Sequence, residues 1–378
     1  MDTQKTRTWA EVSLAALRHN AMALQKALPK GCGLMGVVKA DGYGHGAAQV
    51  ARTLHEAGAR YLAVACPEEA LALRGAGESM PILILGAVDP TWAPVLAENG
   101  FTQTVECRAK GEALSAALLP GQKLTIHIKL DTGMGRIGFC ASDEREIRDA
   151  AAVMTLPNLI TEGIFTHFSV SDTPGQEAYT RRQFELFCRT ADELERLTGK
   201  KIPLRHCANS GAVQFFREEG FCQDLVRPGL LTYGLRPEAD DGSIELIPAM
   251  ELKSRVAAVT HHKKGDTISY GRMWTADRDC TLAVLPIGYA DGLQRRLSGK
   301  LEVELRGHRV RQVGRICMDV CMLDVTDFPE VCPGDVATIF GRADRGAPTA
   351  GEIAALADTI PYEILCGVSP RVPRVYIR

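Results

Sequence analysis

The sequence has no apolar stretch of the roughly 18 to 20 residues that a helix needs to cross a bilayer. Residues 1–7 are polar and charged, and the segment after them lacks the apolar core of a secretory signal peptide. A formal net charge of -2 and the absence of a long basic run argue against a dedicated nucleic-acid surface. We therefore expect a cytoplasmic protein that binds neither membranes nor nucleic acid.

The sequence also lacks a CxxC motif, although it contains 12 cysteines scattered from Cys32 to Cys366. Cys317 and Cys321 are close in sequence, but the residues around them follow a strand pattern, and two cysteines alone make a poor zinc site. Most of the cysteines are expected to be buried as small hydrophobic side chains. No metal site is predicted.

A chain of 378 residues is long enough for two domains. From about residue 33 to 235, short apolar runs alternate with helical patterns, which is typical of repeated βα units. About eight runs are predicted to be strands: 33–40, 61–65, 81–86, 101–105, 123–131, 159–168, 202–207 and a short one near Asp224. Eight parallel strands with intervening helices predict a TIM (β/α)8 barrel rather than a doubly wound sheet. Residues 9–28 are predicted to form an amphipathic helix before the barrel.

Pro237, Pro248 and the acidic turn 238–242 indicate a linker after the barrel. The remaining sequence is mostly β-rich, with predicted strands at 255–260, 281–285, 301–305, 318–325 and 336–340, and one helix at 349–358. The fold class is therefore α/β + β. We expect a barrel domain over residues 1–240, of which the first ten or so can pair with the second domain, and a mostly β C-terminal domain over residues 241–378.

Lys39 closes an apolar run, 33–38, and is followed at once by Ala40-Asp41-Gly42-Tyr43-Gly44-His45-Gly46. A strand can hold the lysine still while the glycine-rich turn lets the backbone approach a ligand, which is the arrangement expected of a Schiff-base lysine. The alternative is an ordinary surface lysine before a turn, and the local pattern alone does not decide between the two.

The run from Val37 to Gly46 resembles the pyridoxal phosphate lysine motif of alanine racemases. The resemblance continues in family order through residues 129–138, 166–168, 206–211, 226–230, 268–272, 286–292 and 314–319, and so covers nearly the whole chain. It implies pyridoxal 5'-phosphate as cofactor and the interconversion of L-alanine and D-alanine. It also implies a role in supplying D-alanine for peptidoglycan.

Active sites of this barrel fold lie at the C-terminal ends of the strands, and the candidate residues fall there. The resemblance implies that Lys39 carries the cofactor, that Arg136 contacts the substrate carboxylate, and that Arg227 faces the pyridine nitrogen. Because arginine stays charged, it disfavours protonation of that nitrogen, which suits racemisation. The other residues that the resemblance places around the cofactor are Tyr43, His167, Ser210, Gly229, Leu230 and Tyr362.

Lys129 lies in a strand whose alternation points His127, Lys129 and Asp131 into the barrel and the apolar residues between them toward the helices. Its position is carbamylated in some members of the family, which would give Arg136 an anionic partner. The alternative is that Lys129 pairs with Asp131. Both possibilities remain open from the sequence.

Inversion of an α-carbon requires one acid/base group on each face, and the resemblance assigns these roles to Lys39 and Tyr270. Nearby cationic groups, including Arg227 through His167, are expected to favour the phenolate of Tyr270. In the family, Tyr270 and Met318 enter the active site of a partner subunit, which implies a homodimer with composite sites. The resemblance also places three further residues at the entry corridor and its surroundings: Tyr289, Arg315 and Asp319.

The residues at Gly42, Leu293, Gln294 and Val320 depart from those common in the family, which leaves a serine-active or broader racemase open. The closest alternative is a pyridoxal-dependent amino-acid decarboxylase with the same two-domain architecture. Such an enzyme would need a carboxylate at the pyridine nitrogen, where this chain has Arg227.

Overall fold

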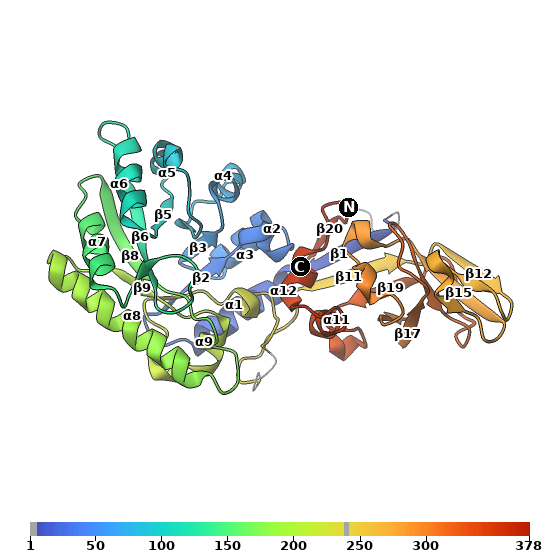
Figure 1. Cartoon of the computed structure of the whole chain (residues 1–378). Coiled ribbons are helices and arrows are strands. Elements are labelled where there is room, and N and C mark those ends of the chain that lie inside the picture. The colour runs from blue at the N-terminus through green and yellow to red at the C-terminus, as the bar shows by residue number, and fades with distance from the viewer. Residues whose placement is uncertain (1–5, 238–241) are drawn as a thin grey trace. The chain divides into compact units, whose positions relative to one another are not determined.

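The computed structural model describes residues 6–237 and 242–378 (Figure 1). The chain divides into two compact units. One unit comprises Leu17–Gly42 and Ala47–Leu246, and the other comprises the described residues up to Ala16 together with Tyr43–Gly46 and Ile247–Arg378. The predicted domain boundary between residues 240 and 241, with most of the predicted acidic turn, lies outside the described residues.

The first unit is built on one sheet of eight parallel strands in the order β10-β2-β3-β4-β5-β6-β8-β9. The sheet curls almost shut, because an isolated bridge joins Asn209 to Arg227 and the Arg227 amide donates to Ala208 O at 2.8 Å. The strands are β2 (Gly33–Val37), β3 (Tyr61–Val64), β4 (Ile82–Ile84), β5 (Thr102–Val105), β6 (Leu124–Asp131), β8 (Leu159–Phe165), β9 (Leu204–His206) and β10 (Leu225–Val226). The predicted barrel is confirmed.

Helices follow the barrel strands, and apolar side chains of both bury one another in the core, as at Leu62, Ile126 and Leu194. The short strand β7 (Phe139–Cys140) pairs with β6. The segment labelled α2 (Lys39–Tyr43) is a turn with left-handed backbone geometry. The helices are α1 (Leu14–Ala27), α3 (Ala47–Glu56), α4 (Pro67–Gly75), α5 (Ala93–Glu98), α6 (Arg108–Ala117), α7 (Glu144–Met154), α8 (Glu177–Thr198), α9 (Ser210–Phe215) and α10 (Gly229–Thr232). No helix within the described part of the chain is long and apolar enough to cross a membrane.

The second unit contains a nine-stranded sheet in the order β12-β15-β18-β17-β16-β19-β11-β1-β20, and the small hairpin β13-β14. Its strands are β1 (Thr8–Ser13), β11 (Met250–Arg255), β12 (Ala258–His262), β13 (Thr267–Ile268), β14 (Trp274–Thr275), β15 (Cys280–Leu285), β16 (Glu302–Leu305), β17 (His308–Val313), β18 (Cys321–Asp324), β19 (Val336–Phe340) and β20 (Arg374–Ile377). Two short helices, α11 (Ala350–Leu356) and α12 (Pro361–Cys366), complete the mostly β domain that the sequence predicted.

The prediction of one helix over residues 9–28 is wrong in its first part. Residues 8–13 form β1, which pairs antiparallel with β11 and parallel with β20, and the helix begins only at Leu14. Trp9, Ala10 and Val12 are buried in the sheet through contacts with strands more than 230 residues away in sequence, which a local pattern cannot reveal. The Ser13 hydroxyl then accepts from the Ala16 amide at 3.1 Å and marks the helix start.

The predicted strand 255–260 is also wrong, because these residues are divided between β11 and β12. The chain changes neighbours at this point: the Val256 amide donates to Asp335 O, whereas the Ala257 amide donates to Val284 O. β11 pairs with β19, and β12 pairs with β15. Strands β7, β13, β14, β17 and β20 and helix α12 were not predicted.

Candidate active site

The structure brings the predicted barrel residues to the C-terminal ends of the strands, which we call the barrel mouth. Lys39 lies two residues beyond the end of β2, and His167 lies two residues beyond the end of β8. Ser210 begins α9 after β9, and Arg227 follows β10. The predicted residues Tyr43, Tyr270 and Tyr362, with the rest of the β-domain candidates, belong to the second unit.

Lys39 is followed by a turn with left-handed backbone geometry. The φ angles of Ala40, Asp41 and Gly42 are 51°, 53° and 61°, and that of Tyr43 is 53°. Left-handed geometry costs an L-residue roughly 1–2 kcal/mol, and such strain persists only where the surroundings enforce it. The turn therefore sets the direction in which the chain leaves the lysine.

Two carboxylates stabilise this turn from within the barrel unit. Asp41 accepts a hydrogen bond from the Ala47 amide at 2.8 Å. Glu69 accepts from the Ala40 amide with one oxygen and from the Ala65 amide with the other, both at 2.7 Å. Glu69 was not predicted from the sequence, although its place in the first turn of the helix after β3 is a signal for a side chain that reaches the barrel mouth.

Arg227 is buried at the barrel mouth and is oriented by several acceptors. Its guanidinium donates to Nδ1 of His206 at 2.6 Å, to Thr166 O at 2.6 Å and to Cys207 O at 3.2 Å. Burial is the main cause that lowers the pKa of Arg227 to about 10, so the group remains charged at neutral pH. His167 Nδ1 lies 3.5 Å from the guanidinium, and burial followed by the charge of Arg227 keeps the His167 pKa well below its usual value.

Lys129 is buried inside the barrel, where its amine donates to Leu130 O at 2.7 Å and lies 5.4 Å from the centre of the Phe165 ring. Burial, followed by the charge of Arg227, lowers the pKa of Lys129 to about 7. A large share of this amine is therefore uncharged at neutral pH. No ion pair within 4.0 Å joins Lys129 to Asp131 among the described residues.

Asp131 instead shapes the loop that carries Arg136. One carboxylate oxygen accepts from the amides of Gly133 at 2.8 Å and Met134 at 2.9 Å, and the other accepts from the Arg136 amide at 3.1 Å. These backbone hydrogen bonds outweigh the cost of burial and hold the Asp131 pKa below its usual value. The exposed side chain of Arg136 thus extends from a loop that is fixed at its base.

Three predicted phosphate-binding residues lie together at the start of the short helix α10. The Ser210 hydroxyl accepts from the Leu230 amide at 2.9 Å, and the Gly229 amide donates to Arg227 O at 2.9 Å. The two backbone amides are thus used internally in this structure. The Ser210 hydroxyl still has its own hydrogen to donate to an anionic ligand.

The charges at the barrel mouth fit pyridoxal 5'-phosphate. The pKa of His167 is lowered by the positive charges of four basic groups, namely Arg227, Arg136, Lys129 and Lys39. Asp131, the acid in this loop, is already engaged by backbone amides. A surplus of positive charge of this kind suits a ligand that carries a phosphate and a phenolic oxygen.

In the second unit, Tyr270 stands on a strained and exposed turn. It begins the short 3-10 helix η4 (Tyr270–Arg272), and its side chain is 71% exposed. Ser269 and Arg272 on either side have positive φ angles of 66° and 51°. The Ser269 hydroxyl donates to Arg315 O at 2.8 Å, so this turn is fastened to the segment that carries Arg315.

Tyr289 and Met318 are carried by two loops that are hydrogen-bonded to each other. The Tyr289 amide donates to Cys317 O and the Ala290 amide to Met318 O, both at 3.0 Å. Gly288 permits this approach, because a Cβ atom there would lie only 2.3 Å from Cys317 O. Tyr289 and Met318 are 44% and 52% exposed.

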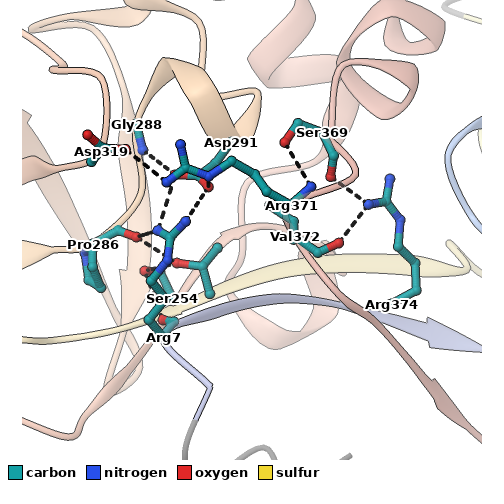
Figure 2. Close-up of polar contacts among 11 residues, drawn as sticks. Arg7, Ser254, Pro286, Gly288, Asp291, Asp319, Ser369, Arg371, Val372 and Arg374 are labelled. Carbon is teal, nitrogen blue, oxygen red and sulfur yellow. Dashed lines mark hydrogen bonds and ion pairs between the residues drawn. The ribbon is translucent and has the colours of Figure 1, made fainter.

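A buried carboxylate that was not predicted, Asp291, is hydrogen-bonded to the loop that carries Tyr289 (Figure 2). Asp291 is fully buried, forms an ion pair with Arg7 at 2.6 Å and lies 3.1 Å from Nε of Arg371. It also accepts from the Gly288 amide at 3.0 Å. Arg371 in turn pairs with Asp319 at 2.8 Å, so the predicted Asp319 is part of this charge cluster.

Tyr43 and Tyr362 lie together in the second unit, with ring centres 5.5 Å apart and planes tilted by 44°. Burial raises the pKa of the Tyr43 phenol above its usual value, with a further contribution from Tyr362. Tyr362 is the second residue of α12 and is only partly buried. The two hydroxyl-bearing side chains are thus brought together by segments that are more than 300 residues apart.

Comparison with known proteins gives one consistent result. The model "Alanine racemase, N-terminal domain" matches residues 12–237, and "Alanine racemase, C-terminal domain" matches residues 249–376. The alanine racemase of Desulforamulus reducens is 46% identical over 99% of this chain and 100% of its own length. That of Desulfovibrio desulfuricans is 43% identical over 98% of both chains.

Solved structures agree with these relatives. The alanine racemase of Clostridium difficile 630 superposes with a TM-score of 0.93 and 36% identity, covering 99% of this chain and 96% of that one. The alanine racemase of Bacillus anthracis with bound L-Ala-P has a TM-score of 0.91 and 36% identity, covering 98% and 95%. The chain belongs to the alanine racemase family of isomerases.

Proposed function

We propose that the protein interconverts L-alanine and D-alanine in the cytoplasm, with pyridoxal 5'-phosphate as cofactor, and that its D-alanine serves peptidoglycan synthesis. The observation that supports this most is Lys39 on its strained turn, in the same barrel mouth as the buried cation Arg227. The names of the relatives and of the solved structures support alanine as the substrate.

The predicted cofactor-binding residues would hold pyridoxal 5'-phosphate through its aldehyde and its phosphate. Lys39 would bind its aldehyde carbon, and Ser210 and the amides of Gly229 and Leu230 would donate to its phosphate, with the hydroxyls of Tyr43 and Tyr362. When bound, the cofactor supplies an electron-withdrawing ring that weakens the α C-H bond of the substrate. Leu230 would limit the space for the substrate side chain and favour alanine.

Two bases on opposite faces would move the proton. Lys39 would take or return it on one face through its amine, and Tyr270 would do so on the other through its phenolic oxygen. His167 would lie between Arg227 and this chemistry as a neutral ring, because its pKa is held well below the usual value by burial and by Arg227.

Arg227 would direct the outcome of proton removal. Its guanidinium has only donors and keeps its charge, so it would disfavour protonation of a ring nitrogen placed against it. With the cofactor bound, the ring would then withdraw electrons less strongly, and a proton removed from the α-carbon would be returned quickly. This favours racemisation over transamination.

Arg136, with Met318 of a partner subunit, would bind the substrate carboxylate. We propose that the neutral amine of Lys129 attacks CO2, forming an N-C bond and releasing one proton, to give a carbamate that balances Arg136. The support is the Lys129 pKa of about 7 and the absence of an ion pair with Asp131 among the described residues. 13C NMR of protein in labelled bicarbonate should then show a carbamate signal that a Lys129→Ala variant lacks. A bare ammonium at this position would exclude the modification.

A homodimer would complete the site. Tyr270, Met273, Tyr289 and Met318 are all at least 44% exposed on the second unit. Hydrogen bonds from Ser269 and Tyr289 to residues 315–317 bring their segments together, and an exposed apolar patch marks an interaction surface. We propose that a second copy covers them, so that Tyr270 and Met318 serve its barrel mouth. Tyr289, Arg315 and Asp319 would line the entry for the substrate or support it.

Proton NMR of L-alanine in D2O with the purified protein and pyridoxal 5'-phosphate tests this function, followed by chiral analysis of the same sample. Loss of the α-proton signal together with the appearance of D-alanine is the expected result. Loss of the carboxylate would instead indicate a decarboxylase. An inert α-proton would reject alanine as substrate and make serine the next amino acid to test.

A further inference from the structure

Arg227 is one end of a chain of hydrogen bonds that runs through the barrel interior. Nε2 of its partner His206 lies 2.9 Å from Nδ1 of His127. Nε2 of His127 lies 3.2 Å from a carboxylate oxygen of Glu162. Both histidines are fully buried, and the chain therefore connects Arg227 to Glu162 without a break.

The hydrogen-bond chain from Arg227 to Glu162 has only one consistent arrangement of protons. A guanidinium cannot accept, so Nδ1 of His206 carries a lone pair and the neutral ring has its proton on Nε2. That proton is donated to Nδ1 of His127, which leaves the His127 proton on Nε2, facing the Glu162 carboxylate. A second proton on either ring would set two N-H groups against each other. Burial, which lowers the pKa of both rings, acts in the same direction.

The Glu162 end of the hydrogen-bond chain lies toward the N-terminal ends of the barrel strands. The Tyr61 hydroxyl donates to the same Glu162 oxygen at 2.8 Å and contacts the Thr102 hydroxyl. Tyr61 and Thr102 are the first residues of β3 and β5, whereas His206 is the last residue of β9. The chain thus runs from the N-terminal ends of the strands to the barrel mouth.

Two irregularities of β8 make room for this contact. The register of β6 and β8 shifts, so that Ile126 faces Thr161 but His127 faces Gly163, which leaves Glu162 as an extra residue. A β-bulge of this kind changes the direction of a side chain. A Cβ atom on Gly163 would lie 2.7 Å from Nε2 of His127, so the imidazole occupies space that only glycine leaves open.

We propose that Glu162 is a positioning residue for Arg227: by accepting the terminal Nε2 proton of His127, it anchors His127 and, through it, the His206 ring against which the guanidinium is held. The inference rests on the proposed function. Arg227 pairs with no carboxylate among the described residues, so Glu162 is the anion at the other end of its hydrogen-bond chain.

Glu162 variants with graded loss of the acceptor test the inference. Glu162→Gln keeps an acceptor oxygen for His127 and Tyr61 but removes the charge. Glu162→Met removes both charge and acceptor at similar length. Glu162→Asp keeps the charge but withdraws the carboxylate by about 1.5 Å, the length of one C-C bond, and is the variant expected to preserve the fold. Glu112→Met, at an exposed glutamate of α6, is the matched control.

The first readout does not require activity: 15N NMR of histidine-labelled protein without cofactor reports which ring nitrogen of His127 and His206 carries the proton. We expect Nε2-H forms for both in the wild type, in Glu162→Gln and in Glu112→Met. In Glu162→Met, and to a smaller extent in Glu162→Asp, the His127 ring loses the acceptor that anchors it, so it should leave its position against His206 and its signals should show a mixture of proton positions. Unchanged proton positions in folded Glu162→Met or Glu162→Asp would overturn the inference.

The second readout is the number of transamination events per racemisation, measured as pyridoxamine phosphate formed per D-alanine formed. Displacement of Arg227 should raise this ratio at least tenfold in Glu162→Met and leave it unchanged in Glu162→Gln and Glu112→Met. A change in proton positions without a change in the ratio would reduce Glu162 to a structural role and overturn the proposal. If the wild type does not racemise alanine, the proposed function fails, and the NMR readout still tests the hydrogen-bond chain alone.

Discussion

Glu69 accepts a hydrogen bond from the Ala40 amide at 2.7 Å, directly after the lysine that follows the first barrel strand. The other oxygen of the same carboxylate accepts from the Ala65 amide, beyond the end of β3. One side chain therefore joins the strained turn to the neighbouring strand of the barrel. Since left-handed geometry is unfavourable for Ala40, this link helps to determine where Lys39 is held.

Replacement of Glu69 by alanine should loosen this turn. Loss of two hydrogen bonds to a charged acceptor at a partly exposed site is expected to lower the free energy of unfolding by roughly 1–3 kcal/mol. We also expect cofactor affinity, measured by fluorescence titration, to fall about tenfold, which corresponds to 1.4 kcal/mol.

Glu68→Ala is the control, because Glu68 is an exposed acid in the same first turn of α4. It shares the interaction with the helix dipole but not the contact with Ala40. Equal effects of the two variants on cofactor affinity would show that Glu69 does not hold the turn.

Asp291 should be important for stability through its two arginines. Arg7 and Arg371 are 39% and 42% exposed, so water can solvate them in part when the carboxylate is removed. We therefore expect Asp291→Asn to lower the free energy of unfolding by roughly 2–3 kcal/mol, less than the loss of a fully buried pair. Urea denaturation measures this directly.

Asp319→Asn is the matched variant, because Asp319 meets the same Arg371 but is exposed. Its effect should stay below about 1 kcal/mol. Equal destabilisation of the two variants would show that burial of Asp291 does not increase the contribution of its ion pairs to the free energy of unfolding.

The sequence predicted the barrel and the mostly β domain because both depend on local signals. Apolar runs of strand length at regular spacing give the eight strands, and strand ends then give the barrel mouth with Lys39 and Arg227. The alternation in β6 correctly predicted that Ile126 and Ile128 are buried on one face of the strand. On the other face, the ring of His127 contacts residues of β8 and β9.

The remaining features depend on partners that are distant in sequence. Arg7 and Asp291 are separated by 284 positions, and neither flanking segment has a pattern that selects the other. The role of Glu162 depends on a bulge, which shifts the period-2 alternation by one residue and so hides the direction of the side chain from a sequence reading. The sequence cannot show the left-handed turn after Lys39 either, since Ala40 and Asp41 are not residues that require it.

The lowered pKa of Lys129 predicts a dependence of stability on pH. The folded-state pKa of about 7 lies below the usual 10.5, so the unfolded chain binds more protons between these two values. The contribution of Lys129 to the free energy of unfolding should therefore rise from about pH 7 to about pH 10.5 and be constant below pH 7. In CO2-free buffer, the stability of the wild type relative to Lys129→Met should follow this curve. A flat difference over the whole range would contradict the burial of an uncharged amine.

Tyr270→Phe should separate proton exchange from inversion. With one of two bases removed, we expect racemisation in both directions to fall by about a thousandfold, within the range typical of a lost acid/base group. Lys39 should still exchange the α-proton of one enantiomer with D2O, and cofactor binding should be unchanged. Deuterium incorporation and chiral analysis on the same sample measure the two processes. Turnover at the wild-type rate would remove Tyr270 from the mechanism.

Mixing two inactive variants tests whether Tyr270 serves the site of a partner. A Lys39→Ala chain retains Tyr270, and a Tyr270→Phe chain retains Lys39, so a heterodimer with shared sites contains one intact site and one doubly altered site. Random exchange of equal amounts gives half heterodimers, and activity should recover to about one quarter of the wild-type value in a two-fold symmetric dimer. Each variant mixed with itself under the same exchange conditions is the control. If subunit exchange is verified by mass-tagged chains and no activity returns, Lys39 and Tyr270 act within one chain, and the exposed surface that carries Tyr270 and Met318 has a different role.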